Sequence, residues 1–228
     1  MQELEQNAFL LHARPYKEHQ IIAEFITEQH GKVSAITYSG NSVKSSKKAL
    51  LQPFIPLKVA FKGQRNLKTI TLLEATAKSW NLTGNYLFSG FYLNELQNKL
   101  LDELLPMPNI FQQYQQSLTQ LAEQQSIEPV LRNFERHLLD ELGYSIDFSL
   151  AFACSTPNCH YVPEQGLVVE QLNTQLPRYP VEHLQAIAQN ELADKQVMQT
   201  YKRLMREVFH HLLDGKPLNS RKLFIKRD

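Results

Sequence analysis

The side chains that could do chemistry are sparse, and the clearest group of them is basic. Between Glu28 and Glu74 the sequence holds no acidic residue but eight Lys or Arg. Such a run either binds anions, most often phosphates, or forms an ordinary solvated face, and both interpretations fit the run taken alone. The eight residues are Lys32, Lys44, Lys47, Lys48, Lys58, Lys62, Arg65 and Lys68.

Motifs for covalent catalysis are absent from the sequence. It contains no G-x-x-x-x-G-K-[ST], G-x-G-x-x-G, H-E-x-x-H or G-x-S-x-G segment and no EF-hand loop. The carboxylates of Glu135, Asp140 and Glu141 lie at the spacing of a helix surface, which favours a solvated face over an acid/base pair. We therefore predict that the protein is not an enzyme and needs no cofactor.

One short segment, Cys154-Ser-Thr-Pro-Asn-Cys159-His160, has residues that bind metals. It offers three ligands, whereas a closed zinc site needs four and usually takes them from a second close pair. We predict no bound metal. A hydrolase that uses Cys159 and His160 stays as an alternative, although the sequence shows no third residue to orient them.

The charge is segregated along a chain of 228 residues, which suits one large domain or two small ones. The net charge is +1 overall, but it is +5 for residues 1–80, −9 for 81–200 and +5 for 201–228. No leader peptide or membrane span is recognisable, and two cysteines cannot form a disulfide framework. We expect a reduced, cytoplasmic protein.

The first 80 residues predict a small β-barrel. Short segments rich in Val, Ile, Phe, Thr and Leu alternate with turn signals such as Arg14-Pro15, His30-Gly31 and Lys62-Gly63. Five such strands are too few for a two-sheet sandwich, so an OB-fold leads and an SH3-like barrel remains the alternative. The expected strands are Phe9–Ala13, Gln20–Ile26, Val33–Tyr38, Leu57–Phe61 and Lys68–Ala75.

After residue 80 the apolar period lengthens to that of helices, which makes the fold class α+β. We predict an OB-fold domain over 1–80 and a helical domain over 81–228 with an irregular insert at about 144–193. Within this insert we expect a hairpin near Val162–Val169 and a short helix near Val181–Gln189. Gly143 and Gly215 stand as helix stops. The long helices are expected at Tyr86–Leu101, Ile110–Leu121, Val130–Leu142 and Val197–Leu213.

A basic barrel with aromatic side chains suits binding of single-stranded nucleic acid, where cations follow the phosphates and rings stack on bases. Tyr16 and Tyr38 are candidate stacking residues, and we place Phe61 in the core. The segment Ser39–Lys48 and the basic end Lys216–Arg227 add charge suited to sequence-independent contact with phosphates.

Six segments in order resemble a known family, the bacterial DNA recombination and repair protein RecO. They cover nearly the whole chain, and the last, GKPLNSRKLF, resembles the closing motif of the family. The resemblance departs in two places: only two cysteines stand where many members have four, and Gly40 is followed by Asn41-Ser42 where an Arg is common. The six segments are Ala8–Val33, Leu50–Leu57, Asn66–Ala75, Tyr92–Leu96, Leu131–Tyr144 and Gly215–Phe224.

The resemblance implies a mediator of DNA repair and recombination in the RecF pathway of the DNA-damage response, associated with the nucleoid. It implies binding of single- and double-stranded DNA, single-strand annealing, and loading of RecA together with RecR. It also implies binding of the acidic C-terminal tail of single-strand-binding protein. An RNA-binding OB-fold protein remains the alternative. The expected DNA contacts are Arg14, Lys44, Lys47, Lys48, Lys62, Arg65 and Lys68, with Lys216, Arg221 and Lys222 secondary.

For the acidic tail, the few cations of the acidic middle block are the candidates. An acidic peptide that ends in an apolar residue needs an apolar pocket bordered by Arg or Lys. We expect Arg132 together with Arg203 or Arg206. An ion pair of Arg132 with Glu135 or Glu207 is the structural alternative.

Overall fold

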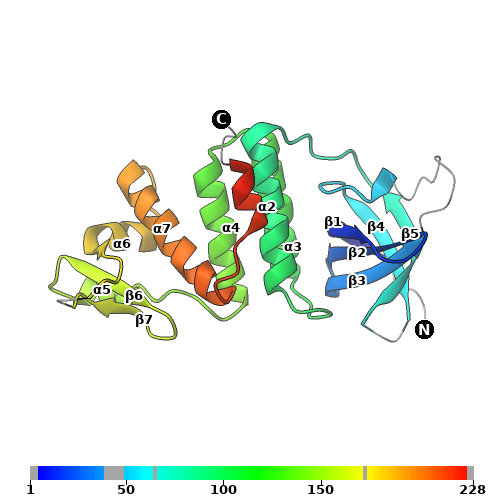
Figure 1. The fold of residues 1–228 in the computed structure, drawn as a ribbon. Helices are drawn as coiled ribbons and strands as arrows, with labels where there is room; N and C mark the ends of the chain where they lie inside the picture. The colour runs from blue at the N-terminus through cyan, green and yellow to red at the C-terminus, as the bar shows by residue number, and fades with distance from the viewer. Residues whose placement is uncertain (1–4, 39–48, 64–65, 172–173, 225–228) are drawn as a thin grey trace. The chain divides into compact units, whose positions relative to one another are not determined.

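The structure is a computed structural model that describes residues 5–38, 49–63, 66–171 and 174–224 (Figure 1). The chain forms two compact units. Unit 1 comprises residues 1–125 together with 218–228, and unit 2 comprises residues 126–217. The boundary expected near residue 80 thus falls inside unit 1, because two helices and the end of the chain pack with the barrel. None of the helices in the described ranges is long and apolar enough to cross a membrane.

Five strands of unit 1 close into a barrel in the order β1-β2-β3-β5-β4, with both antiparallel and parallel pairs. Strand β3 pairs with β5 in parallel, and β1 pairs with β4 to close the ring. This order is that of an OB-fold, so the OB-fold prediction is confirmed over the SH3-like one. The strands are β1 (Gln6–Pro15), β2 (Gln20–Thr27), β3 (Gly31–Tyr38), β4 (Leu57–Lys62) and β5 (Lys68–Ala75).

Strand β1 is apolar on both faces, which explains its unbroken run of hydrophobic residues. Ala8 and Leu10 belong to the core inside the barrel. Phe9 is equally buried, and its ring lies 5.3 Å from each of the rings of Phe111 and Tyr114. Since successive strand residues point to opposite faces, one side of β1 fills the barrel and the other packs against helices.

Two helices of unit 1, α2 (Gly84–Leu100) and α3 (Pro108–Ala122), are fixed to the barrel by a buried polar side chain. The Asn94 amide nitrogen donates to the carbonyls of Leu10 and Leu11, at 3.3 and 3.2 Å. Its amide oxygen accepts from the Tyr114 hydroxyl at 2.5 Å. A buried amide costs little only when it is hydrogen-bonded, so these bonds specify where α2 lies on β1.

Unit 2 packs four helices with a small sheet of order β7-β6-β8. The predicted helices and hairpin are confirmed, whereas α5 and β8 were not expected. Gly143, at φ 78°, follows the end of α4, where the sequence predicts a stop. The elements are α4 (Ile127–Glu141), α5 (Ser149–Ala153), β6 (Asn158–Val162), β7 (Gly166–Val169), β8 (Tyr179–Pro180), α6 (Val181–Ala188) and α7 (Lys195–Leu212).

Candidate nucleic-acid interface

The outer face of β2 and β3, which many OB-folds use for ligands, is partly covered by the protein's own chain. The segment that joins α2 to α3 lies along β3, where the Leu104 amide donates to the Lys32 carbonyl at 2.8 Å. The Ser34 hydroxyl donates to the Glu103 carboxylate, and the Lys32 ammonium donates to the Asn98 carbonyl at 3.0 Å. Nucleic acid cannot occupy this part of the face.

Gly31 shows how close this segment lies to the barrel. Its φ is +66°, and a Cβ added there would stand 1.8 Å from the Leu105 carbonyl oxygen. Only glycine fits a left-handed backbone this close to another chain segment. The sequence marks Gly31 merely as part of a turn, so this close approach is visible only in the structure.

Exposed side chains around two turns of the barrel remain available to a ligand. Arg14 is the last residue but one of β1. Tyr16 follows in the β1–β2 turn, where its amide donates to the Gln20 carbonyl at 3.0 Å. Gln20 in turn pairs with Tyr38 at the end of β3. Tyr16 is 46% and Tyr38 63% exposed, so both rings can meet a base.

The second turn joins β4 to β5 and carries two lysines. Lys62 is exposed and lies opposite Thr69, and the half-buried Lys68 donates to the Gly63 carbonyl at 3.1 Å. In strand order, β3 lies between the β1–β2 hairpin and the β4–β5 hairpin. We call Arg14, Tyr16, Tyr38, Lys62 and Lys68 together the turn surface.

The structure confirms some expectations for individual residues of the barrel and leaves others as predictions. Phe61 packs against the barrel core, with its ring 5.8 Å from that of Phe25, as predicted. Among the described residues Arg14 makes no ion pair, so its guanidinium is not paired with Glu18 there. Four expected DNA contacts lie outside the described residues: Lys44, Lys47, Lys48 and Arg65.

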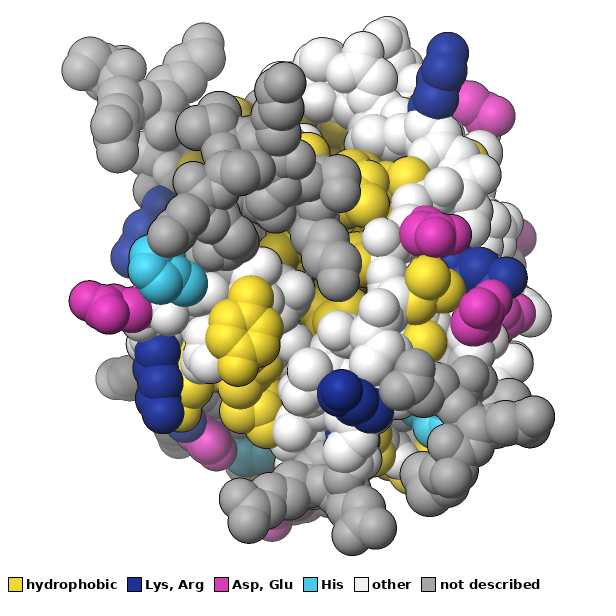
Figure 2. Space-filling view, turned by 90° about the vertical axis from the view of Figure 1, so that its right-hand side faces the viewer, with side chains coloured by type: hydrophobic (Ala, Val, Ile, Leu, Met, Phe, Trp, Pro, Cys, Tyr) yellow, Lys and Arg dark blue, Asp and Glu magenta, His cyan; other side chains and the backbone are white. Residues whose placement is uncertain are grey.

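Two lysines of the acid-free run are engaged within unit 1. Lys32 is bonded to Asn98, as described above, and the Lys58 ammonium lies 2.7 Å from the Glu5 carboxylate. Neither is among the expected DNA contacts. Figure 2 shows the side that lies to the right in Figure 1, where the described Lys and Arg are spread around the edge among Asp and Glu, with apolar side chains between them.

The basic end of the chain is divided between the two units. Lys216 lies in unit 2, exposed and 3.6 Å from the Asp214 carboxylate. Arg221 and Lys222 lie in the 3-10 helix η1 (Asn219–Phe224) of unit 1. Arg221 stands over the Tyr92 ring at 6.0 Å, and Lys222 donates to the Asn219 side chain at 3.2 Å.

A carboxylate on α2 holds η1 in place, a role that the sequence did not reveal. Glu95 accepts from the amides of Asn219 and Ser220, both at 2.8 Å, and from the Ser220 hydroxyl at 2.7 Å. Burial alone would raise the pKa of Glu95, but these bonds and the nearby Lys99 ammonium outweigh it and lower the pKa. The closing motif thus docks the chain end onto α2 as well as carrying charge.

Of the three arginines expected to bind an acidic tail, Arg132 is not available to a ligand. It is 4% exposed, and its guanidinium lies 2.5 Å from the fully buried Glu135 carboxylate. The structural alternative with Glu135 is therefore what the structure contains. Arg203 is exposed, donates to the Arg178 carbonyl and stands 4.7 Å from the centre of the Tyr179 ring. Arg206 is exposed and has no ion pair with a described residue.

A small cavity in unit 2 has the character that the expected tail site needs, and sequence reasoning did not assign it. It holds about 160 Å³ and is lined by the apolar side chains of Leu139, Ile146, Phe148 and Met205. Arg136 and Asp140 also line it, one turn of α4 apart. Burial raises the pKa of Tyr201, another lining residue, to about 12 against the opposing charge of Arg136. The i, i+4 spacing of Arg132 and Arg136 was the available signal, but it did not tell which of them is buried.

The cysteine segment is built unlike a nucleophilic site. The two sulfurs of Cys154 and Cys159 are 3.7 Å apart, and burial raises the pKa of the Cys159 thiol to about 12. His160 is fully buried, and its Nδ1 lies 2.9 Å from the Pro177 carbonyl. Neighbouring residues on β6 point to opposite faces, so His160 is poorly placed to activate Cys159. In the described part of the chain, no three His, Cys, Asp or Glu side chains are grouped to hold a metal.

Comparison with known proteins decides the family. The family model described as Recombination protein O N terminal matches residues 1–78, and the one described as Recombination protein O C terminal matches residues 82–222. The chain belongs to the RecO family. One RecO model ends at residue 78 and the other begins at residue 82, close to the domain boundary expected near residue 80. The division into compact units is different, because unit 1 extends to residue 125.

Curated relatives agree over nearly the full length. The DNA repair protein RecO of Tolumonas auensis is 38% identical over 223 residues, covering 95% of this chain and 93% of the relative. That of Pseudoalteromonas atlantica is 39% identical, covering 96% and 92%. That of Haemophilus influenzae is 37% identical, covering 98% and 97%. The resemblance predicted from the six segments is thereby confirmed, and RecO family members are DNA repair proteins rather than a named class of enzyme.

Proposed function

We propose that the protein is a recombination mediator that binds single- and double-stranded DNA and anneals complementary strands. The observation that carries this proposal is the turn surface, where exposed or half-buried cations and two exposed tyrosines border an OB-fold barrel of the RecO family. Cations serve the phosphates of both kinds of DNA, and the two tyrosine rings suit unpaired bases. The DNA partner would place the protein at the nucleoid.

Annealing by this surface needs no covalent step. Two DNA strands repel each other through their phosphates, and cations that neutralise part of that charge lower the barrier to pairing. Each Lys or Arg that contacts a phosphate releases counterions, so affinity falls steeply with salt. We further propose that the protein, together with RecR, loads RecA onto DNA coated by single-strand-binding protein, a role that rests on its membership of the RecO family.

The test is the salt dependence of DNA binding by the double variant Arg14→Ala/Lys68→Ala. We expect weaker binding of all sequences, and the slope of log K against log salt should fall by about 2, which corresponds to two lost phosphate contacts. Lys78→Ala, an exposed lysine after β5, is the matched control and should leave the slope nearly unchanged. An unchanged slope in the double variant would remove the turn surface from the proposal.

Competition with RNA distinguishes the proposed DNA-binding function from the alternative, an RNA-binding OB-fold protein. If labelled single-stranded DNA is displaced by unlabelled DNA of the same sequence far better than by RNA, the repair function stands. Displacement by RNA at much lower concentration would favour the RNA-binding alternative. Annealing of complementary DNA strands, measured by the loss of an unpaired-strand signal, is the accompanying functional assay.

For the acidic tail of single-strand-binding protein, we propose the cavity of unit 2. A cavity of ~150 Å³ is enough to hold a benzene ring, so the 160 Å³ here admits one aromatic or large aliphatic side chain. Arg136 at its wall would pair with the terminal carboxylate, and Arg206 would serve the acidic residues before it. Arg203 is a weaker candidate because it is bonded to Arg178 and Tyr179.

The experiment for this site measures binding of a tail peptide by Arg136→Ala. We expect a loss of about tenfold or more in affinity, because a charge-assisted hydrogen bond at an apolar site contributes about 1.5–3 kcal/mol. Lys195→Ala, at the exposed start of the same helix that carries Arg206, is the control. Equal peptide affinity in Arg136→Ala and wild type would place the tail elsewhere.

A further inference from the structure

A cavity of unit 1 lies beside β1, α2 and η1 and has no role in the fold described so far. It holds about 400 Å³, within the range of ~300–1,000 Å³ typical of ligand pockets. Leu11, Phe91 and Leu223 give it an apolar lining that includes one aromatic ring. His12 and Lys99 are the basic residues of the lining. All of these residues belong to unit 1, so the cavity is complete within it.

The cavity contains little negative charge that would repel a phosphate. Glu95 is its one carboxylate among the lining residues, and that group accepts three hydrogen bonds from Asn219 and Ser220. The Lys99 ammonium lies 3.3 Å from the same carboxylate. The Glu95 carboxylate thus stays ionised, with its charge balanced by Lys99 and its oxygens held by groups of the cavity wall. Asn94, also in the lining, is likewise fixed by its bonds to β1 and Tyr114.

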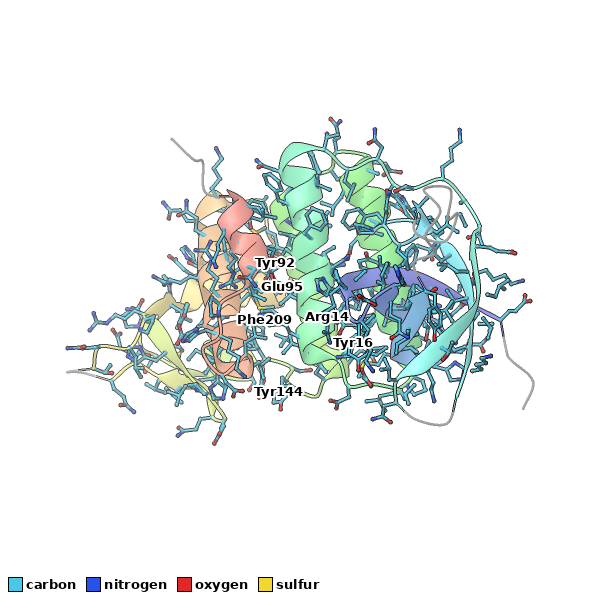
Figure 3. The ribbon with its side chains drawn as sticks, turned by 45° about the vertical axis from the view of Figure 1, so that its right-hand side comes forward. Arg14, Tyr16, Tyr92, Glu95, Tyr144 and Phe209 are labelled. Atoms are coloured by element: carbon cyan, nitrogen blue, oxygen red, sulfur yellow. The ribbon has the colours of Figure 1, made fainter. Side chains whose placement is uncertain are left out.

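The cavity and the turn surface are neighbours along β1. His12 lines the cavity and Arg14 belongs to the turn surface, and both are exposed. Residues two apart on a strand project from the same face, so a ligand bound at Arg14 is led along β1 to the cavity. Figure 3 shows Glu95 on α2 with Arg14 and Tyr16 beyond it on the barrel side of unit 1. The 3-10 helix η1, which lines the cavity through Asn219, Ser220 and Leu223, also carries Arg221 and Lys222.

We propose that this cavity takes one unstacked base of a single-stranded DNA whose backbone follows Arg14 and His12 toward Lys222. The proposal rests on the DNA-binding function proposed above and adds a single-strand-specific site to it. Phe91 would supply the ring against which the base packs, and the apolar lining would exclude water from it. A duplex keeps its bases paired and stacked, so it would use the turn surface but not this cavity.

The test compares single-stranded and double-stranded DNA in the variant Leu223→Trp. Leu223 is 42% exposed, so a larger side chain can fill the cavity from its open side without a buried residue being replaced. We expect affinity for single-stranded DNA to fall about tenfold while affinity for duplex DNA stays within twofold. A strand carrying 2-aminopurine should show a rise in fluorescence on binding wild type, because the base unstacks, and a smaller rise on binding the variant.

A second variant and the turn surface variant separate the outcomes. Phe91→Leu removes the ring but keeps an apolar side chain, and it should reproduce the selective loss for single strands. Thermal unfolding of both cavity variants confirms that they fold. If wild type binds neither form of DNA, the proposed function fails. If Arg14→Ala/Lys68→Ala binds DNA weakly but both cavity variants bind single strands like wild type, only the cavity proposal fails. Loss of tail-peptide binding in Leu223→Trp with unchanged single-strand binding would also overturn it, in favour of a peptide pocket.

Discussion

Lys62 on the barrel and Arg132 in unit 2 are cations used in opposite ways. Lys62 is exposed at the end of β4 and has no ion pair with a described residue. Arg132 is 4% exposed and lies 2.5 Å from a carboxylate that is itself fully buried. The barrel of unit 1 therefore presents cations to solvent, whereas α4 of unit 2 uses one to hold its own core.

The difference follows from where carboxylates lie in the sequence. Residues 81–200 carry a net charge of −9, so a cation there meets a carboxylate more readily than a cation of the acid-free run does. Arg132 pairs with Glu135 and Arg178 with Glu170, and Lys202, just after this segment, pairs with its Glu128. The acid-free run between Glu28 and Glu74 offers few such partners. A scarce cation in an acidic segment is thus as readily structural as functional.

The largest expected effect comes from breaking the buried pair. Arg132→Met removes the cation and leaves the Glu135 carboxylate buried, which should lower the free energy of unfolding by about 3–5 kcal/mol. Denaturant unfolding followed by circular dichroism measures the change. The double variant Arg132→Met/Glu135→Leu removes both charges and should recover most of the loss. Arg14→Ala, the control on the barrel, should change stability by about 0.5 kcal/mol or less.

The covered part of the barrel gives the next largest effect. Gly31→Ala puts a Cβ against the Leu105 carbonyl and places alanine in a left-handed conformation. Strain and overpacking together should destabilise the protein by about 2–4 kcal/mol. Gly166→Ala is the matched control, because its φ is also positive, at +78°, but its Cβ would meet no atom within 4 Å. Equal losses in the two variants would show that the α2–α3 segment does not press on β3.

For replacement of Glu95 we expect a smaller effect on stability, and one that depends on pH. Its pKa is lowered in the folded protein, so its ionised form stabilises the fold above the unfolded pKa, and this contribution is lost as the pH falls through the folded pKa. Glu95→Gln should therefore cost about 1–2 kcal/mol at pH 7, and the difference from wild type should shrink below pH 4.5, the ordinary value for this group. Unfolding measured from pH 7 to pH 3 tests this, with Glu74→Gln, exposed at the end of β5, as the control.

We expect the thiols of Cys154 and Cys159 to differ in reactivity, without an effect on DNA binding. Because burial raises the pKa of Cys159 to about 12, its thiol stays protonated at neutral pH. Cys154→Ser, which keeps only Cys159, should react with iodoacetamide far more slowly than Cys159→Ser, which keeps the half-buried Cys154. Fast alkylation of Cys159 at pH 7 would revive the hydrolase alternative.

The sequence predicted the barrel well because its signals are local. Each strand is a short apolar segment between turn residues, and every predicted strand lies within about three residues of the observed one. The sequence did not show that α2, α3 and η1 join the barrel, because this depends on long-range contacts such as those of Asn94 with β1 and Glu95 with η1. Nor did it tell Arg132 from Arg136, since the two lie on one helix and differ only in what packs against them.

The finest test of the comparison uses two lysines on one strand. Lys58 and Lys62 stand four residues apart on β4, so both project from the same face of the strand, but only Lys58 pairs with Glu5, at 2.7 Å. If availability rather than residue type decides DNA contact, Lys62→Ala should lower the salt slope of DNA binding by about 1. Lys58→Ala should change the slope much less, because its ammonium already has a carboxylate partner. Equal slopes in the two variants would mean that DNA displaces the Glu5 pair and that the exposed and engaged cations of the barrel do not differ.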